Sequence, residues 1–161
     1  MGSGTRTPAP DVRVGMRLAT SADLPEVVAL ERECYSDPWP ASAFAALPDN
    51  PRVFFAIARD AESGRLAGYV IAWFVLDEGE LANLAVTPKA RRHGVGSKLL
   101  ERVLEDATAR GTRDLYLEVR ASNTAAQALY GRREFKEVGR RKSYYRSPTE
   151  DALILRRTLK P

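Results

Sequence analysis

The segment from Gly94 to Arg110 constrains the fold of this chain most, because its apolar residues recur with the period of an α-helix. The predicted inward face consists of Leu99, Leu100, Val103, Leu104 and Ala107. Gly111 follows directly, as is typical of a residue that ends a helix. Apolar strands are predicted on either side of this helix, over 80–87 and 114–119. A long helix between two strands indicates an α/β fold.

Shorter patterns place the remaining elements around this unit. Further strands are predicted over 12–19, 53–58, 66–76, 135–139 and 153–157, with turns at 60–64 and 77–79. Further helices are predicted from Leu24 to Cys34, over 42–47, and from a cap at Ser122 or Asn123 through Tyr130. The order βααβββαβαββ predicts a mixed, twisted sheet of about seven strands with helices on both faces.

Length and composition fit one domain. The 161 residues are 44% hydrophobic and 29% charged, which is ordinary for a globular protein. We expect a disordered leader over residues 1–11, without a signal-peptide pattern, and one domain over 12–161. The longest apolar run, 69–76, is far too short to span a bilayer, so we expect a cytoplasmic protein that binds no membrane.

Cysteine and histidine are scarce. The single cysteine, Cys34, excludes an internal disulfide, and with one histidine the chain offers few soft ligands, so we expect no metal site. The formal net charge is +4, and seven basic residues against two acidic ones fall between Arg132 and Arg146. Two interpretations stay open for this run: a solvated strand and loop, or a patch for a phosphate-rich ligand or a ribosomal partner.

A glycine-containing loop joins the strand over 80–87 to the long helix. It reads Arg91-Arg92-His93-Gly94-Val95-Gly96-Ser97. Glycines remove Cβ atoms where backbone must approach a ligand, and the start of a helix offers unpaired N–H groups that favour phosphate. Neither a Walker motif nor a dinucleotide fingerprint is present, because no Gly-Lys-Ser/Thr follows and the third glycine is missing.

Three polar residues follow the strand over 114–119. Glu118 lies at the end of an otherwise apolar strand, where burying a carboxylate is costly without a partner or a purpose. Asn123 suits a helix cap, and Tyr130 lies two turns further along the same side of that helix. Each has an ordinary alternative: an ion pair for Glu118, a cap for Asn123 and core packing for Tyr130. The residues alone leave both interpretations open.

From about Val12 to Leu159 the chain resembles the GNAT acetyltransferases, and more narrowly the RimI-type alanine N-acetyltransferases of a small-subunit ribosomal protein. The matching motifs are Asp37-Pro38-Trp39, Val75-Leu76-Asp77-Glu78, Asn83-Leu84-Ala85-Val86-Thr87-Pro88, Arg91–Gly96, Leu117–Asn123, Ala128-Leu129-Tyr130, Tyr144-Tyr145 and Glu150-Asp151-Ala152. The Arg-x-x-Gly-x-Gly piece is common to the superfamily, whereas Leu-Glu-Val-Arg-x-Ser-Asn marks the N-terminal-amine acetyltransferases. One departure is Glu134, where the family usually has the glycine that ends the tyrosine helix.

The resemblance implies a role for each matching residue. Acetyl-CoA is the implied co-substrate, and its implied binding residues are Leu84, Ala85 and Val86 at the pantetheine arm, Arg91, Arg92, His93, Gly94, Val95, Gly96 and Ser97 around the pyrophosphate, and Asn123. The pantetheine residues lie where the fourth strand splays from the fifth. Glu118 is the implied proton acceptor and Tyr130 the implied proton donor.

The implied reaction is direct attack of a protein N-terminal amine on the thioester, with the N-terminal alanine of a ribosomal protein as the expected acceptor. An N-terminal amine has a pKa of about 8, so Glu118 removes a proton before attack. The leaving thiolate belongs to a thiol of pKa about 8.5, and Tyr130, with a reference pKa of about 10, donates to it. Backbone N–H groups at 84–86 polarise the carbonyl oxygen. No covalent intermediate is required, so Cys34 is assigned to packing.

We therefore expect a monomeric acyltransferase that acts on a protein or peptide and binds no specific nucleic acid. Two alternatives stay open. The first is an acetyltransferase of the same fold that acts on lysine side chains or a small-molecule amine. The second, motivated by the basic run at 132–146, is a non-catalytic module that binds CoA or RNA.

Overall fold

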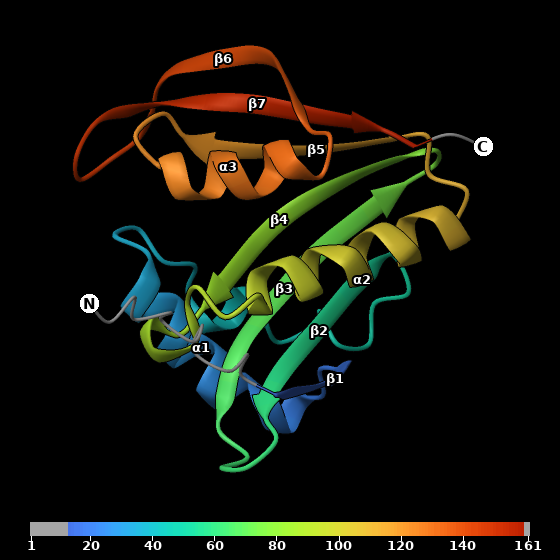
Figure 1. The fold of residues 1–161 in the computed structure, drawn as a ribbon, viewed down its shortest axis with the longest axis vertical. Coiled ribbons are helices and arrows are strands. Elements are labelled where there is room, and N and C mark those ends of the chain that lie inside the picture. Colours follow the sequence, from blue (N-terminus) through green and yellow to red (C-terminus); the bar gives the residue numbers. More distant parts are fainter. Residues whose placement is uncertain (1–12, 160–161) are drawn as a thin grey trace, which may run out of the picture.

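A seven-stranded sheet forms the centre of the structure, a computed structural model that describes residues 13–159. Figure 1 shows the strands in the order β1-β2-β3-β4-β5-β7-β6. They are β1 (Val14–Leu18), β2 (Val53–Asp60), β3 (Leu66–Val75), β4 (Glu78–Val86), β5 (Asp114–Arg120), β6 (Lys136–Tyr145) and β7 (Glu150–Thr158). Strands β4 and β5 run parallel, whereas the other neighbouring strands are antiparallel. The predicted mixed sheet is confirmed; the predicted leader over 1–11 lies outside the described residues.

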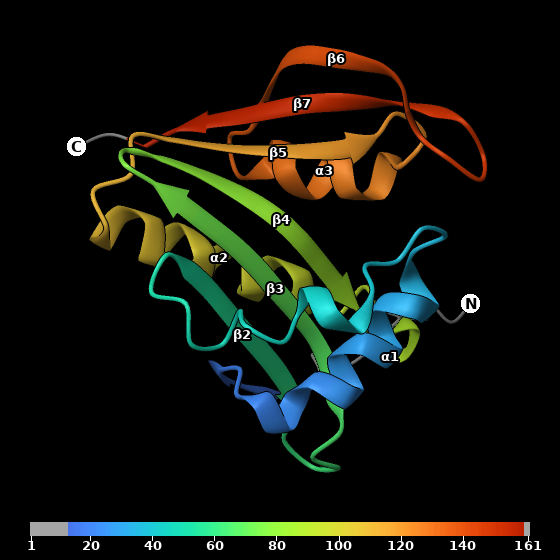
Figure 2. The ribbon, with the colours of Figure 1, turned by 180° about the vertical axis from the view of Figure 1, so that it is seen from behind.

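Helices cover both faces of the sheet, as predicted. Helix α1 (Leu24–Cys34) packs on one face, and α2 (Val95–Ala109) and α3 (Thr124–Arg132) pack on the other, as the two opposite views in Figures 1 and 2 show. Each face has its own apolar cluster, one around α1 and one around α2. The predicted inward face of α2 is buried throughout. No helix within residues 13–159 is both long and apolar enough to cross a membrane.

Two local predictions differ from the structure. The segment 42–47 forms no α-helix; it contains the 3-10 helix η2 (Ala41–Ala43) followed by turns. Pro40 and Pro48 leave too few residues between them for a stable helix to propagate. The strand predicted over 135–139 continues to Tyr145, because β6 is an exposed edge strand whose polar residues show no apolar alternation.

Strand β4 bends where it loses its partner β5. Across the β3–β4 pair, Ile71 faces Asn83 and Ala72 faces Leu81, so Ala82 is an extra residue that forms a β-bulge. The pairing of β4 with β5 ends at this same point, at Leu81 opposite Leu117. Beyond it β4 and β5 no longer pair with each other, although β4 stays paired with β3 and β5 with β7 to their ends. The bulge therefore coincides with an opening between the two parallel strands.

Glu134 adopts the backbone conformation that glycine usually supplies. Its φ is +66°, in the left-handed region that costs a non-glycine residue about 1–2 kcal/mol. The N–H of the next residue, Phe135, donates to the carbonyl of Tyr130 at 3.1 Å, and the Phe135 side chain is buried. The chain thus leaves α3 through a glycine-like turn although the residue at this position is a glutamate.

Candidate functional site

The backbone of β4 forms one wall of the opening. The Tyr35 hydroxyl donates to the carbonyl of Leu84 at 2.7 Å, and the Arg91 Nε donates to the carbonyl of Val86 at 3.1 Å. Both carbonyls therefore point away from β3. The carbonyl of Ala85 faces β3 instead, as the alternation of an antiparallel ladder requires. Of the three residues predicted to bind a pantetheine arm, Leu84 and Val86 thus present their backbone groups to the opening.

The loop before α2 ends in a set of unpaired N–H groups. Gly94 is the N-cap residue, with φ +79°, and its carbonyl accepts the first helical hydrogen bond from the Lys98 N–H at 3.0 Å. Within residues 13–159 no acceptor faces the N–H groups of Val95, Gly96 and Ser97. The first turn of α2 also lacks acidic side chains. Unpaired donors and the positive end of the helix dipole together favour an anion, so the geometry agrees with the predicted phosphate loop.

The basic side chains of this loop differ in their surroundings. Arg91 is exposed but reaches toward α1, with its Nη2 atom 3.5 Å from the Cys34 Sγ atom. Arg92 is exposed, with φ +66°, and His93 is half-buried. Burial raises the pKa of the Cys34 thiol, which agrees with the packing role assigned to this residue.

Asn123 caps α3. Its side-chain Oδ1 atom accepts a hydrogen bond from the Ala126 N–H at 3.1 Å. The helix-cap alternative is therefore present in the structure. The exposed amide Nδ2 group is the part of this residue that stays available to a ligand, and its predicted contact with a cofactor stays a prediction.

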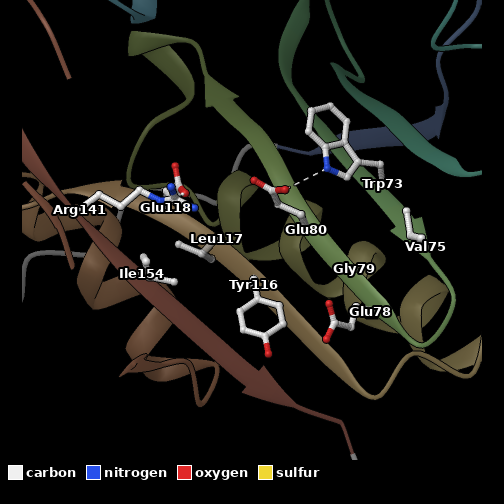
Figure 3. A pocket seen from close by; sticks show the side chains of 10 residues that line it. All are labelled: Trp73, Val75, Glu78, Gly79, Glu80, Tyr116, Leu117, Glu118, Arg141 and Ile154. Carbon is white, nitrogen blue, oxygen red and sulfur yellow. Dashed lines mark hydrogen bonds and ion pairs between the residues drawn. The ribbon is translucent and has the colours of Figure 1, made fainter. Parts of the chain in front are cut away.

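Glu118 faces a pocket of about 400 Å³ on the sheet face opposite α3. Its neighbours Leu117 and Val119 are buried on the other face, as strand alternation requires. The Glu118 side chain is 18% exposed, and its Oε1 atom lies 2.7 Å from the Arg141 Nε atom. Figure 3 shows the two side chains side by side at one end of the pocket. The ion-pair alternative is thus also present, with its cationic partner on β6.

The remainder of the pocket is acidic and aromatic. Glu80 lies on β4, where its Oε2 atom accepts a hydrogen bond from the Trp73 indole N–H at 3.1 Å (Figure 3). Glu78 and Tyr116 also line the pocket. Three carboxylates, counting Glu118, therefore face the one guanidinium of the lining. This excess of negative charge favours a cationic occupant over an anionic one.

Tyr130 lies on α3, on the opposite face of the sheet from Glu118. Its side chain is 6% exposed and packs against Phe135, with the ring centroids 5.7 Å apart. Its hydroxyl forms no hydrogen bond with any residue in the range 13–159, but its oxygen keeps some contact with solvent, because the fully buried side-chain oxygen without a partner in that range is that of Thr112. Burial raises the pKa of Tyr130. The ring thus serves the core as the packing alternative predicts, while the hydroxyl retains a free hydrogen-bonding capacity.

Tyr35 lies against the β4 wall of the opening, and the sequence patterns did not single it out. Besides its hydrogen bond to Leu84, burial and the nearby Tyr130 phenol raise the pKa of Tyr35, with burial the larger cause. Tyr35 is the C-cap residue of α1, so no periodic pattern marks it. Its position depends on how α1 packs against the end of β4 that no longer pairs with β5.

A buried polar cluster under β4 was also missed. Both Glu31 carboxylate oxygens accept hydrogen bonds from the Asn83 amide at 2.9 Å, and the Tyr69 hydroxyl donates to Oε2. Burial raises the pKa of Glu31, which is 1% exposed. A signal was present: Glu31 falls three and four residues after Val28 and Val27, on the apolar side of α1.

The basic run between Arg132 and Arg146 lies on β6 and its flanks. Part of its charge is used within the protein. The ion pairs are Arg133 with Glu101, Arg140 with Asp151 and Glu137, and Arg141 with Glu118. The structure therefore favours an ion-paired edge strand for this part of the run over a continuous free patch.

Known proteins share this sequence and this arrangement. The acetyltransferase (GNAT) family model matches residues 24–135. The ribosomal protein bS18-alanine N-acetyltransferase of Escherichia coli (strain K12) is 38% identical over 139 residues, which cover 84% of this chain and 90% of that protein. The crystal structure of the ribosomal-protein-S18-alanine N-acetyltransferase from Escherichia coli has a TM-score of 0.84 at 34% identity and covers 92% of this chain and 96% of that one. Arabidopsis thaliana NAA60 in complex with acetyl-CoA shares the fold, with a TM-score of 0.82 at 20% identity over 91% of this chain and 99% of that one.

Proposed function

We propose that this chain, which belongs to the acetyltransferase (GNAT) family, transfers the acetyl group of acetyl-CoA to the N-terminal amine of a protein. The proposed acceptor is the N-terminal alanine of a bacterial ribosomal protein. The observation that carries the proposal is the 38% identity, over 84% of the chain, to an Escherichia coli enzyme named for that reaction. We assign the activity to one domain over 12–161, in a cytoplasmic enzyme that acts as a monomer.

The residues around the opening fit acetyl-CoA. The unpaired N–H groups at the start of α2 suit its pyrophosphate, with Arg92 and the rest of the loop through Ser97 around it. The backbone groups of Leu84 and Val86 suit the amide-bearing pantetheine arm, because they face away from β3. When bound, acetyl-CoA supplies the thioester that the acceptor amine attacks.

The two proposed catalytic side chains approach from opposite faces of the sheet. Glu118 faces the acidic pocket, whereas Tyr130 lies on the α3 side. The two faces of the sheet are connected by the opening beyond Leu81 and Leu117, where β4 and β5 no longer pair with each other. We infer that the acceptor enters from the pocket and acetyl-CoA from the α2 and α3 side, so that amine and thioester meet in the opening.

The chemistry assigned to these residues is direct transfer. Glu118 takes the first proton from the acceptor ammonium, and the freed amine forms the new C–N bond as the C–S bond breaks. The nitrogen releases its second proton to water, which also returns a proton to Tyr130 after transfer. The Tyr130 hydroxyl, which has no partner within the described part of the chain, gives its proton to the departing sulfur. An ammonium must compete with Arg141 for the Glu118 carboxylate, and the neighbouring Glu80 adds to the attraction.

Acetyl transfer to two peptides tests the proposal. One peptide begins with a free alanine; the other is blocked at its N-terminus and carries an internal lysine. We expect transfer from acetyl-CoA to the free alanine and none to the lysine. Transfer to the lysine alone would move the function to side-chain acetylation, and transfer to neither would contradict a peptide acceptor.

A pair of glycine substitutions tests the cofactor loop. Gly94→Val forces a β-branched residue into φ +79°, which should distort the start of α2 and raise the KM for acetyl-CoA by about tenfold or more. Gly64→Val is the matched control, because φ is +72° there and the turn between β2 and β3 holds no proposed ligand group. An equal KM in the two variants would contradict the phosphate-loop assignment.

A further inference from the structure

The guanidinium of Arg120 uses all four of its Nη hydrogens on separate acceptors. Its Nη2 atom lies 3.0 Å from the Ser36 Oγ atom and 3.1 Å from the carbonyl oxygen of Arg146. Its Nη1 atom lies 3.2 Å from the carbonyl oxygen of Pro148 and 3.3 Å from the Glu150 Oε2 atom. A planar fork with fixed donor directions can satisfy such a set, whereas a lysine ammonium cannot.

These acceptors come from two segments that are far apart in the sequence. Ser36 follows the end of α1, whereas Arg146 and Pro148 belong to the turn between β6 and β7, and Glu150 is the first residue of β7. Arg120 is the last residue of β5, two positions after Glu118 and on the same face of the strand. One side chain therefore joins both segments to the strand that carries the proposed base.

Contacts around this guanidinium extend to the rest of the site. The Arg120 Cζ atom lies 4.4 Å from the centre of the Tyr145 ring, a cation–π contact. The neighbouring Tyr144 lies beside Glu118, whose carboxylate raises the pKa of the Tyr144 phenol. Glu150 also accepts a hydrogen bond from the Ser122 N–H, next to the cap of α3. The position of the β6–β7 hairpin relative to Glu118 thus depends on Arg120.

We propose that Arg120 is a positioning residue for the acceptor peptide, an inference that rests on the proposed function. It touches no reacting atom. By holding the α1 exit and the β6–β7 turn against the end of β5, it fixes the position at which Glu118 meets a peptide that enters from the pocket. Among residues 13–159 no hydrogen bond joins the Arg120 side chain to the loop before α2, so the phosphate-binding part of the opening keeps its geometry when Arg120 changes.

Steady-state kinetics of Arg120→Lys tests this role, with Arg113→Lys as the control. Arg113 lies just before β5, and its exposed side chain pairs with Asp114 at 3.8 Å. With the free-alanine peptide, Arg120→Lys should raise the peptide KM by about tenfold or more, because small displacements of positioning groups have effects of that size. The KM for acetyl-CoA should stay within about twofold of wild type, and Arg113→Lys should resemble wild type in both constants.

Ser36→Ala keeps the test valid if Arg120→Lys folds poorly. It removes one of the four acceptors and should raise the peptide KM by a smaller factor in the same direction. A wild-type peptide KM in both variants, or an equal rise in the KM of both substrates, overturns the role of Arg120 and leaves the proposed function intact. A wild-type enzyme that acetylates no peptide overturns the proposed function, and this role with it.

Discussion

The buried cluster under β4 and the acidic pocket beside β5 lie on the same face of the sheet, yet their carboxylates have opposite surroundings. Glu31 is 1% exposed and is surrounded by fixed donors from Tyr69 and Asn83. Glu118 is 18% exposed and pairs with one guanidinium from an edge strand. A sealed, fully hydrogen-bonded carboxylate stabilises one arrangement of the chain, whereas a partly exposed one held by side chains of an edge strand can receive a proton from a substrate.

The largest effect on catalysis is expected for Glu118→Gln. The amide has the size of the acid but cannot accept the proton, so kcat should fall by about 10²- to 10⁴-fold. The free energy of unfolding should change by less than about 1 kcal/mol, because the Glu118–Arg141 pair is solvent-accessible. Kinetics with the free-alanine peptide and urea denaturation measure the two quantities. Glu62→Gln, in an exposed turn, is the control, and an unchanged kcat for Glu118→Gln would contradict the assignment.

Glu31→Ala should show the reverse pattern. It leaves the Tyr69 hydroxyl and the Asn83 amide without an acceptor in a buried site, which should lower the free energy of unfolding by about 3 kcal/mol. We expect kcat to fall less than for Glu118→Gln. Glu33→Ala, exposed on the same helix, controls for the loss of a glutamate from α1. Equal stabilities of the two alanine variants, measured by urea denaturation, would contradict the structural role of Glu31.

Two Tyr→Phe substitutions should separate catalysis from stability in the same way, with smaller effects. Tyr130→Phe removes a hydroxyl that has no partner among residues 13–159 and keeps the ring packed against Phe135, so kcat should fall by about tenfold or more with little change in stability. Tyr69→Phe removes the donor to Glu31, so stability should fall by about 1–2 kcal/mol while kcat changes little. Thermal unfolding and peptide kinetics on both variants measure these effects, and a Tyr130→Phe enzyme of normal kcat would leave the proton donor unassigned.

The smallest effect concerns the pH dependence of stability. Burial raises the pKa of Glu31 above its unfolded value of about 4.3, so its contribution is fully present below that pH and is lost as pH rises through the folded pKa. Arg17, the main cause, lowers the pKa of Asp23, so that group contributes above about 3.9 and its contribution is lost as pH falls. The Tm of Glu31→Gln should therefore rise relative to the Tm of wild type as pH increases from 4 to 8. For Asp23→Asn, the loss of Tm should shrink as pH falls below 4; the opposite trends would contradict these assignments.

Much of the fold follows from local patterns in the sequence. The apolar period of α2, the glycine that follows it and the strands predicted on either side indicated an α/β chain, and the family and the mixed sheet are confirmed. The resemblance motifs also selected Glu118 and Tyr130, whose catalytic roles stay predictions. The helix predicted over 42–47 was wrong because the two flanking prolines leave too few residues for a helix. The strand predicted over 135–139 was too short because an exposed edge strand carries no apolar alternation.

The sequence by itself determined which segments become helices and strands, because burial of one face imposes a period that is visible along the chain. Only the tertiary structure decided that Ala82 bulges where β4 leaves β5, that Glu31 is sealed under Asn83, and that Arg120 joins Ser36 to a turn beyond β6. Such contacts link residues that are far apart in the chain. They depend on strand order and on how each helix packs across the sheet, and no local pattern encodes these.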